Sequence, residues 1–354
     1  MVLEKLKVLL TQTTPQTPEP ELSLQELSPQ TKEKLSCKLA ELRPPQTYTE
    51  ALKEALNSAI ARWQDEPNAP NNLVILASSG EPLESILGTV LSNGQISSSL
   101  SQRWLLSSPS CQVQKRIQQL KAELKEVPER QLVILPRLSQ SFLRCIGSLE
   151  IINKLGEAVF NHPDSFWLIG CHSWAWQYLI QAKGIQGRFC QTFPLPKLSG
   201  EAIKAWLEPV RASMEITQDE EQEYFENLAE ISSGLSQVAG ELWLRSLGHE
   251  KELEKETSPL SLIPLIQQQA LLPKLPKLAM SDRYLLYSLA LHEQLTIPDL
   301  ATSLGENSSD ILISIQRLQQ EGLLQRYQEY FVINPIYYSQ LRRDLEQNNF
   351  LVEE

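Results

Sequence analysis

Short apolar runs that alternate with helix-like segments restrict the fold of this 354-residue sequence more than any other feature. Continuous apolar runs of this length are typical of strands that are buried on both faces. Elsewhere the apolar residues recur at three- and four-residue spacing, as in 142–160, which predicts a long helix. The pattern therefore predicts an α/β fold with a mostly parallel sheet and flanking helices. We expect its strands at 73–77, 102–106, 131–135, 166–171 and 187–193.

Composition limits the class of protein. Hydrophobic residues make up 42% of the chain, which is enough for folded cores, and the net charge of −11 argues against nonspecific binding to nucleic acid or anionic membranes. The five cysteines and four histidines show no metal-ligand spacing, so we expect reduced thiols and no metal or other cofactor. No apolar run approaches a membrane span, and the N-terminus does not resemble a signal peptide. These features predict a cytoplasmic protein without membrane insertion.

Changes in composition divide the chain into five segments. Residues 1–28 are rich in Thr, Gln, Pro and Glu, which predicts a flexible tail. Residues 29–196 would form the α/β domain with its N-terminal helices, and 197–262 an all-α lid. A linker at 263–276 would follow. Residues 277–354 show three helical segments and then a two-stranded hairpin, which predicts a winged-helix domain.

The segment after the first expected strand has the outline of a phosphate-binding loop without its chemistry. Such a loop needs Gly-Lys-Ser/Thr, so that N–H groups and an ammonium face the phosphates and a hydroxyl holds magnesium. Here the carboxylates of Glu81 and Glu84 would repel phosphate, and Pro82 lacks an N–H. From these residues alone, the segment is either a degenerate nucleotide loop or an ordinary strand–turn–helix.

The order of strand–loop–helix, central strands, helical bundle and winged helix resembles P-loop ATPases of the AAA+ and STAND type. The resemblance covers roughly residues 71–352 and implies a P-loop-NTPase-like sheet. It places Leu83 at the phosphate-binding lysine and Glu84 at the magnesium-binding hydroxyl of a degenerate nucleotide loop, which also contains Ser79 and Gly80.

Further positions follow from the same resemblance. Pro136 and Arg137 stand where the family ends a strand with the magnesium-binding and water-activating carboxylates. His172 or Ser173 would be the sensor-like residue at the end of another strand, and Arg245 would mimic an arginine of the lid. With the catalytic positions substituted, the resemblance implies a pseudo-ATPase, not an enzyme.

The expected winged helix raises the question of DNA. Its candidate reading helix, 308–320, needs Lys or Arg for phosphates and Arg, Asn or Gln for base edges. Only Arg317 in it is basic, and 277–354 holds six basic and eleven acidic residues. This charge disfavours DNA and favours docking to a protein. The candidate reading face consists of Ser308, Ser309, Gln316, Arg317 and Gln320.

We therefore expect a non-catalytic, AAA+/STAND-like regulatory or scaffold protein that acts through protein–protein contacts, with the winged helix as docking module. Glu81, Pro82 and Leu83 would fill the former nucleotide cleft and fix the lid against the sheet. Two alternatives stay open at this point. One is a winged-helix DNA-binding transcription regulator, and the other is an ATP-binding switch with atypical nucleotide motifs.

Overall fold

A five-stranded parallel sheet forms the centre of the computed structural model, in the order β3-β4-β5-β2-β6. Its strands are β2 Asn72–Ala77, β3 Ser101–Trp104, β4 Gln131–Leu135, β5 Phe166–His172 and β6 Thr192–Pro194. The predicted α/β fold with a parallel sheet and flanking helices is confirmed. The structure describes residues 24–92, 100–106, 113–127, 129–212, 216–217, 221–250, 265–267 and 269–351.

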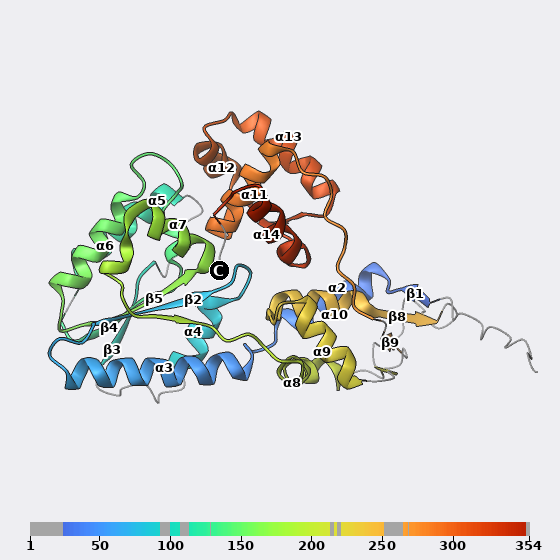
Figure 1. The fold of residues 1–354 in the computed structure, drawn as a ribbon, viewed down its shortest axis with the longest axis horizontal. Coiled ribbons are helices and arrows are strands. Elements are labelled where there is room, and N and C mark those ends of the chain that lie inside the picture. The colour runs from blue at the N-terminus through green and yellow to red at the C-terminus, as the bar shows by residue number, and fades with distance from the viewer. Residues whose placement is uncertain are drawn as a thin grey trace, which may run out of the picture.

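Helices cover both faces of this sheet, which explains why the central strands are apolar throughout. Every residue of β5 is buried, and Val74 and Val133 are fully enclosed. Helices α3 and α4 lie below the sheet in Figure 1, and α5, α6 and α7 lie above it. Their bounds are α3 Gln46–Asp65, α4 Leu83–Ser92, α5 Val113–Glu123, α6 Glu150–Asn161 and α7 Ser173–Lys183. In the described part of the chain, no helix is both long and apolar enough to cross a membrane.

The helix expected at 142–160 begins only at Glu150, so this prediction was wrong at its N-terminal end. Residues Leu138–Gln140 form a 3-10 helix, η1, and turns continue to α6. Within these turns the backbone N–H of Arg144 donates to His292, far along the chain. This contact diverts an N–H group that a helix would need, so tertiary structure overrides the local helical pattern.

A helical segment follows the sheet, as predicted. It consists of α8 Gly200–Arg211, α9 Glu221–Ile231 and α10 Ser236–Ser246, and it packs against α2 Pro29–Ala40. A small four-stranded sheet, β1-β8-β9-β7, adjoins these helices and was not predicted. Its first strand lies inside the segment 1–28 that the composition marks as a tail. The strands are β1 Leu24–Glu26, β7 Ile216–Thr217, β8 Leu247–Glu250 and β9 Leu265–Gln267.

The C-terminal region stands above the carboxyl ends of β2 and β5 (Figure 1). Its helices α11 and α14 face the sheet, and Tyr287 of α11 packs edge-on against Trp174 of α7, with ring centroids 6.1 Å apart. A three-stranded antiparallel sheet, β10-β12-β11, completes it. The elements are α11 Met280–His292, β10 Gln294–Leu295, α12 Ile297–Leu304, α13 Ser308–Gln320, β11 Leu324–Tyr327, β12 Tyr330–Ile333, a 3-10 turn Pro335–Tyr337 and α14 Tyr338–Gln347.

Gly170 in β5 tests how closely the strand ends pack. A Cβ there would lie 2.2 Å from the Pro136 carbonyl oxygen and 2.9 Å from Leu83 Cδ2. Gly170→Ala should therefore lower the free energy of unfolding by about 1–3 kcal/mol, because backbone must move. Urea unfolding measures the change. Gly88→Ala in α4 is the matched control, since nothing lies within 4 Å of its Cβ position, and it should be neutral or stabilising by up to about 1 kcal/mol. Equal effects of the two substitutions would contradict this packing.

Candidate functional site

A buried carboxylate anchors the loop that follows β2. Glu81 is 4% exposed and accepts hydrogen bonds from the Ser236 N–H at 2.5 Å and the Ser236 hydroxyl at 2.6 Å. It also accepts a hydrogen bond from the Tyr48 hydroxyl at 3.2 Å. Ser236 is the first residue of α10, where the helix dipole favours a negative group, and Tyr48 lies in the first turn of α3. One side chain thus joins the loop to two helices from distant parts of the chain.

The environment of Glu81 matches a carboxylate that acts as an acceptor. Burial raises its pKa above the usual value, and the hydrogen bonds from Ser236 and Tyr48 offset only part of that rise. Burial also raises the pKa of Tyr48, whose hydroxyl keeps its proton and donates it. The donors at this helix N-terminus, which in other proteins hold phosphate, are therefore already occupied by the chain's own acid.

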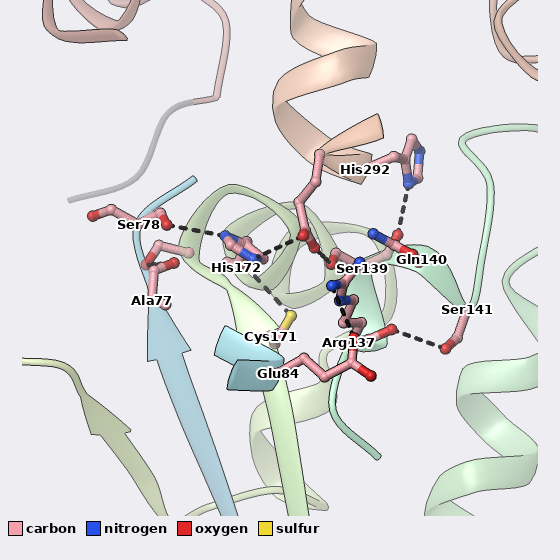
Figure 2. Close-up of polar contacts among 12 residues, drawn as sticks. Ala77, Ser78, Glu84, Arg137, Ser139, Gln140, Ser141, Cys171, His172 and His292 are labelled. Carbon is pink, nitrogen blue, oxygen red and sulfur yellow. Dashed lines mark hydrogen bonds and ion pairs between the residues drawn. The ribbon is translucent and has the colours of Figure 1, made fainter. Parts of the chain in front are cut away.

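Leu83 and Glu84, which follow Glu81 in the loop after β2, differ in their exposure to solvent. Leu83, at the position that the resemblance gives to the phosphate lysine, is buried. Glu84 points outward and pairs with Arg137, with Oε2 and Nη2 2.8 Å apart (Figure 2). The structure thus brings together two candidate positions that lie on separate segments of the sequence. Both side chains are substantially exposed, at 52% and 35%, so the pair contributes little stability.

A second carboxylate reaches the end of β5 from the C-terminal region. Glu293, the residue after α11, has Oε2 3.1 Å from His172 Nε2, and the Ser139 hydroxyl donates to its Oε1. The His172 Nε2–H is not aligned with Oε2, so the contact is an ion pair without good hydrogen-bond geometry. His172 Nδ1 donates to the Ser78 carbonyl at 3.0 Å, as Figure 2 shows. Because both ring nitrogens face acceptors, the site favours the charged imidazolium of His172.

The pKa values of this pair follow from its geometry. Burial by itself would lower the pKa of His172, but Glu293 and the Ser78 carbonyl outweigh burial and Arg137, so the pKa is raised. Burial would raise the pKa of Glu293, but His172, Arg137 and Ser139 lower it to about 2. Glu293 also has a φ of +66°, which is uncommon outside glycine. The surrounding contacts therefore hold this residue in an unfavourable backbone conformation.

The neighbouring His292 is in the opposite state. Its Nδ1 donates to the Ser139 carbonyl at 2.8 Å, and its Nε2 accepts from the Arg144 N–H at 3.2 Å. Burial lowers its pKa to about 4, with Arg144 and Arg116 acting in the same direction. His292 is therefore neutral. Together the two adjacent residues attach the end of α11 to the segment that follows β4.

A cleft of about 250 Å³ remains between the loop and the C-terminal hairpin. Ser79 and Gly80 line it, and β11, β12 and the start of α14 form its other wall. The charged groups that line it are Glu81, Glu293 and Arg137, two carboxylates and one guanidinium. A cleft with this charge does not favour a nucleotide phosphate. In the described residues, no group of three or more His, Cys, Asp or Glu side chains is arranged to hold a metal ion.

The remaining sensor-like candidates do not line this cleft. The Ser173 hydroxyl donates to the Ala77 carbonyl at 3.1 Å and so joins the ends of β2 and β5. Arg245 is exposed in the last turn of α10. At a rise of 1.5 Å per residue, it lies about 13 Å along the helix axis from Ser236. Pro136 contributes its backbone carbonyl beside Gly170.

The candidate reading face of α13 is only partly polar. Arg317, its one basic residue, forms an ion pair with the buried carboxylate of Asp282 in α11. Two large apolar side chains also lie on this exposed surface, Leu312 at 40% and Ile313 at 67%. The sequence analysis did not include these two residues. The polar residues Ser308, Ser309, Gln316 and Gln320 are exposed as expected.

The sequence placed Glu81 in the filled cleft but did not identify its partners, and four residues that make the site were missed. One of them, Glu293, is an acid, and nothing in its local sequence distinguishes it from an exposed acid. The other three are Tyr48, Ser139 and Ser236.

Comparisons with known proteins give only distant similarities. No family model matches this chain, and no curated protein matches it. Among solved structures it is similar to Cdc6p from Pyrobaculum aerophilum, with 11% identity over 87% of this chain and 97% of that one, at a TM-score of 0.40. It is also similar to the Aeropyrum pernix ORC2 protein, with 12% identity over 87% and 94% of the two chains and a TM-score of 0.37. The FIGL-1 AAA domain matches with 13% identity over 64% and 80%, at a TM-score of 0.37.

Glu81 and Glu84 give a matched pair of acids in one loop. Glu81→Ala removes the acceptor from the buried donors of Ser236, so the free energy of unfolding should fall by about 1–3 kcal/mol for each donor left unpaired. Glu84→Ala removes only an exposed ion pair and should cost less than about 1 kcal/mol. Urea unfolding at neutral pH measures both. A Glu81→Ala variant as stable as Glu84→Ala would show that the buried contacts do not hold the lid.

The ion pair of His172 and Glu293 predicts a pH dependence of stability. The pKa of His172 is raised in the native state, so its stabilisation is full below about pH 6.5 and is lost as pH rises through the raised pKa. The pKa of Glu293 is lowered to about 2. Its stabilisation is therefore present above about pH 4.5 and is lost as pH falls toward 2.

Unfolding followed from about pH 6 to pH 9 should show this alkaline loss in the wild type. Glu293→Gln should abolish it and lower the His172 pKa measured by NMR. Glu84→Gln serves as the control and should keep the wild-type profile, because Glu84 does not contact the histidine. An unchanged His172 pKa in Glu293→Gln would disprove the assignment.

Proposed function

We propose that this chain is a non-catalytic regulatory or scaffold protein whose AAA+/STAND-like ATPase domain has lost its nucleotide chemistry. The observation that carries the proposal is the Glu81 carboxylate, buried in the loop and bound to Ser236 of α10. In a nucleotide-controlled ATPase, a bound phosphate would meet the loop at this place. In this chain a side chain makes the contact permanently.

The neighbouring residues support the same interpretation. Leu83 is buried in the position of the phosphate-binding lysine, and Glu84 is paired outside with Arg137. Neither Pro136 nor Arg137 can supply the carboxylate that magnesium and the attacking water need. The lid would therefore keep one orientation whatever the nucleotide concentration.

The C-terminal region would be the docking module. We interpret its helices α11, α12 and α13 and its hairpin as a winged helix, held on the sheet by the His172–Glu293 pair and the Trp174–Tyr287 contact. The exposed Leu312 and Ile313 on α13 suit a protein surface. A DNA-reading helix needs cations for phosphates, and the arginine of this helix is already paired. We therefore propose a protein partner in preference to DNA.

Calorimetry tests the loss of nucleotide binding. ATP and ADP, each with and without magnesium, should give no saturable heat in the micromolar range. Leu83→Lys should restore no hydrolysis, because the acidic residues after β4 are also missing. Micromolar, magnesium-dependent binding by the wild type would overturn the proposal and favour a nucleotide switch.

Cross-linked affinity capture from the native cells tests the docking face. Ile313→Glu should remove a specific partner, because it places a charge on the exposed face of α13. Phe160→Glu is the matched control, since Phe160 is 83% exposed on α6 in the α/β domain, and it should leave capture unchanged. Equal capture by both variants would place the partner elsewhere. Salt-sensitive capture of DNA that Arg317→Ala abolishes would favour the transcription regulator.

A further inference from the structure

We propose that a second cleft, where the sheet, the lid and α14 meet, binds a small phosphate-bearing anion. The cleft has a volume of about 240 Å³. Ser78 of the loop, Lys197 after β6 and Ser233 before α10 line one side, and Arg342 and Arg343 of α14 line the other. It lies apart from the cleft lined by Glu81 and Glu293, with which it shares only Tyr338.

The charge of this cleft differs from that of the first one. Lys197, Arg342 and Arg343 give three positive charges, and Glu346 gives one negative charge. In the part of the chain that the structure describes, none of the three cations has a carboxylate partner within ion-pair distance. Three cations converging on a cleft without a matching number of acids raise the local concentration of anions.

Arg342 supplies a second, independent observation. Its Nε is buried without a hydrogen-bond partner in the structure. A buried donor without an acceptor costs about 1–3 kcal/mol, and more for a charged group. Arg342 also lines the cleft, so a small shift of its side chain toward a bound anion would give this nitrogen an acceptor and offset that cost.

Hydroxyl groups from all three parts of the chain complete the cleft. Ser78, Ser233 and Ser339 line it, and the hydroxyl oxygens of Ser233 and Ser339 lie 3.4 Å apart. Hydroxyl donors combined with guanidinium groups match the several oxygens of a phosphate, to which arginine donates in pairs.

The size of the cleft limits the ligand. Sites for drug-sized ligands are about 300–1,000 Å³, so this cleft suits a small anion better than a whole nucleotide. The one carboxylate, Glu346, is exposed and is outnumbered by three cations, so the cleft still favours a compact, multiply charged anion. The ligand would therefore be a phosphate or a short oligophosphate group, either free or at the end of a larger molecule.

A ligand in this cleft would affect how firmly the loop after β2, the lid and α14 are held together. Ser78 belongs both to this cleft and, through its carbonyl, to the contact with His172. A ligand that touches the loop, the lid and α14 together binds only while they are assembled. By linkage it would stabilise that assembly.

The probe for the test is inorganic pyrophosphate, added to the full chain at low salt and compared with sodium chloride of equal ionic strength. We expect saturable binding by calorimetry and a raised unfolding temperature. The double variant Arg342→Gln/Arg343→Gln should bind at least about tenfold more weakly, because it loses charge-assisted hydrogen bonds. Arg62→Gln, an exposed arginine on α3, is the control and should bind as the wild type does.

Two further variants separate a loss of binding from a loss of folding. Lys197→Gln changes an exposed side chain, so it should fold normally and still weaken binding, and Glu346→Gln should strengthen it. ADP that competes with pyrophosphate, weakly and without magnesium, supports the proposal with the terminal phosphates of a larger molecule as the ligand and leaves the proposed loss of micromolar nucleotide binding intact. ADP that does not compete supports it with a free oligophosphate as the ligand. No saturable binding, or an equal loss in Arg62→Gln, would overturn it.

Discussion

Two carboxylates, one buried and one partly buried, hold the three parts of this chain together at the carboxyl edge of its central sheet. Glu81 joins the loop after β2 to the lid, and Glu293 joins the C-terminal region to His172 at the end of β5. Each acid is supplied by the chain and is surrounded by donors or by a cation. Because a buried acid without partners costs several kcal/mol, the donors and the acids must come together as a unit. This requirement fixes the relative orientation of the parts.

The carboxylates specify this arrangement, and apolar packing provides most of its stability. A buried ion pair recovers little more than the cost of its own desolvation. Around the His172–Glu293 pair, Trp174 contacts Tyr287 and Tyr338, and Phe142 packs against the ring of His292 at 4.9 Å. Burial of aromatic side chains of this size is worth far more than a single ion pair. The aromatic residues therefore stabilise the interface, and the charged groups determine its register.

The strands could be predicted from the sequence because an apolar run bounded by turns carries its own signal. β4 occupies the predicted residues, since its pattern is local. That Glu81 fills the cleft was expected, but its partner could not be predicted, because Ser236 lies 155 residues further along the chain. The same limit applies to 142–149, which is not helical: the backbone N–H of Arg144 donates to His292 of the C-terminal region. The ion pair of Arg317 with Asp282 could not be predicted either, because the two residues lie on different helices.

The position of Glu293 bears on how the C-terminal region can act. Its positive φ, the ion pair with His172 and the neutral His292 form one connected set around Ser139. Detaching α11 would expose an acid and a charged histidine together and would also separate the aromatic contacts. Contacts that must break together make the detached state rare, so a ligand would need a large difference in affinity to populate it. This cooperativity is more consistent with a surface held ready for a partner than with a switch that moves at each binding event.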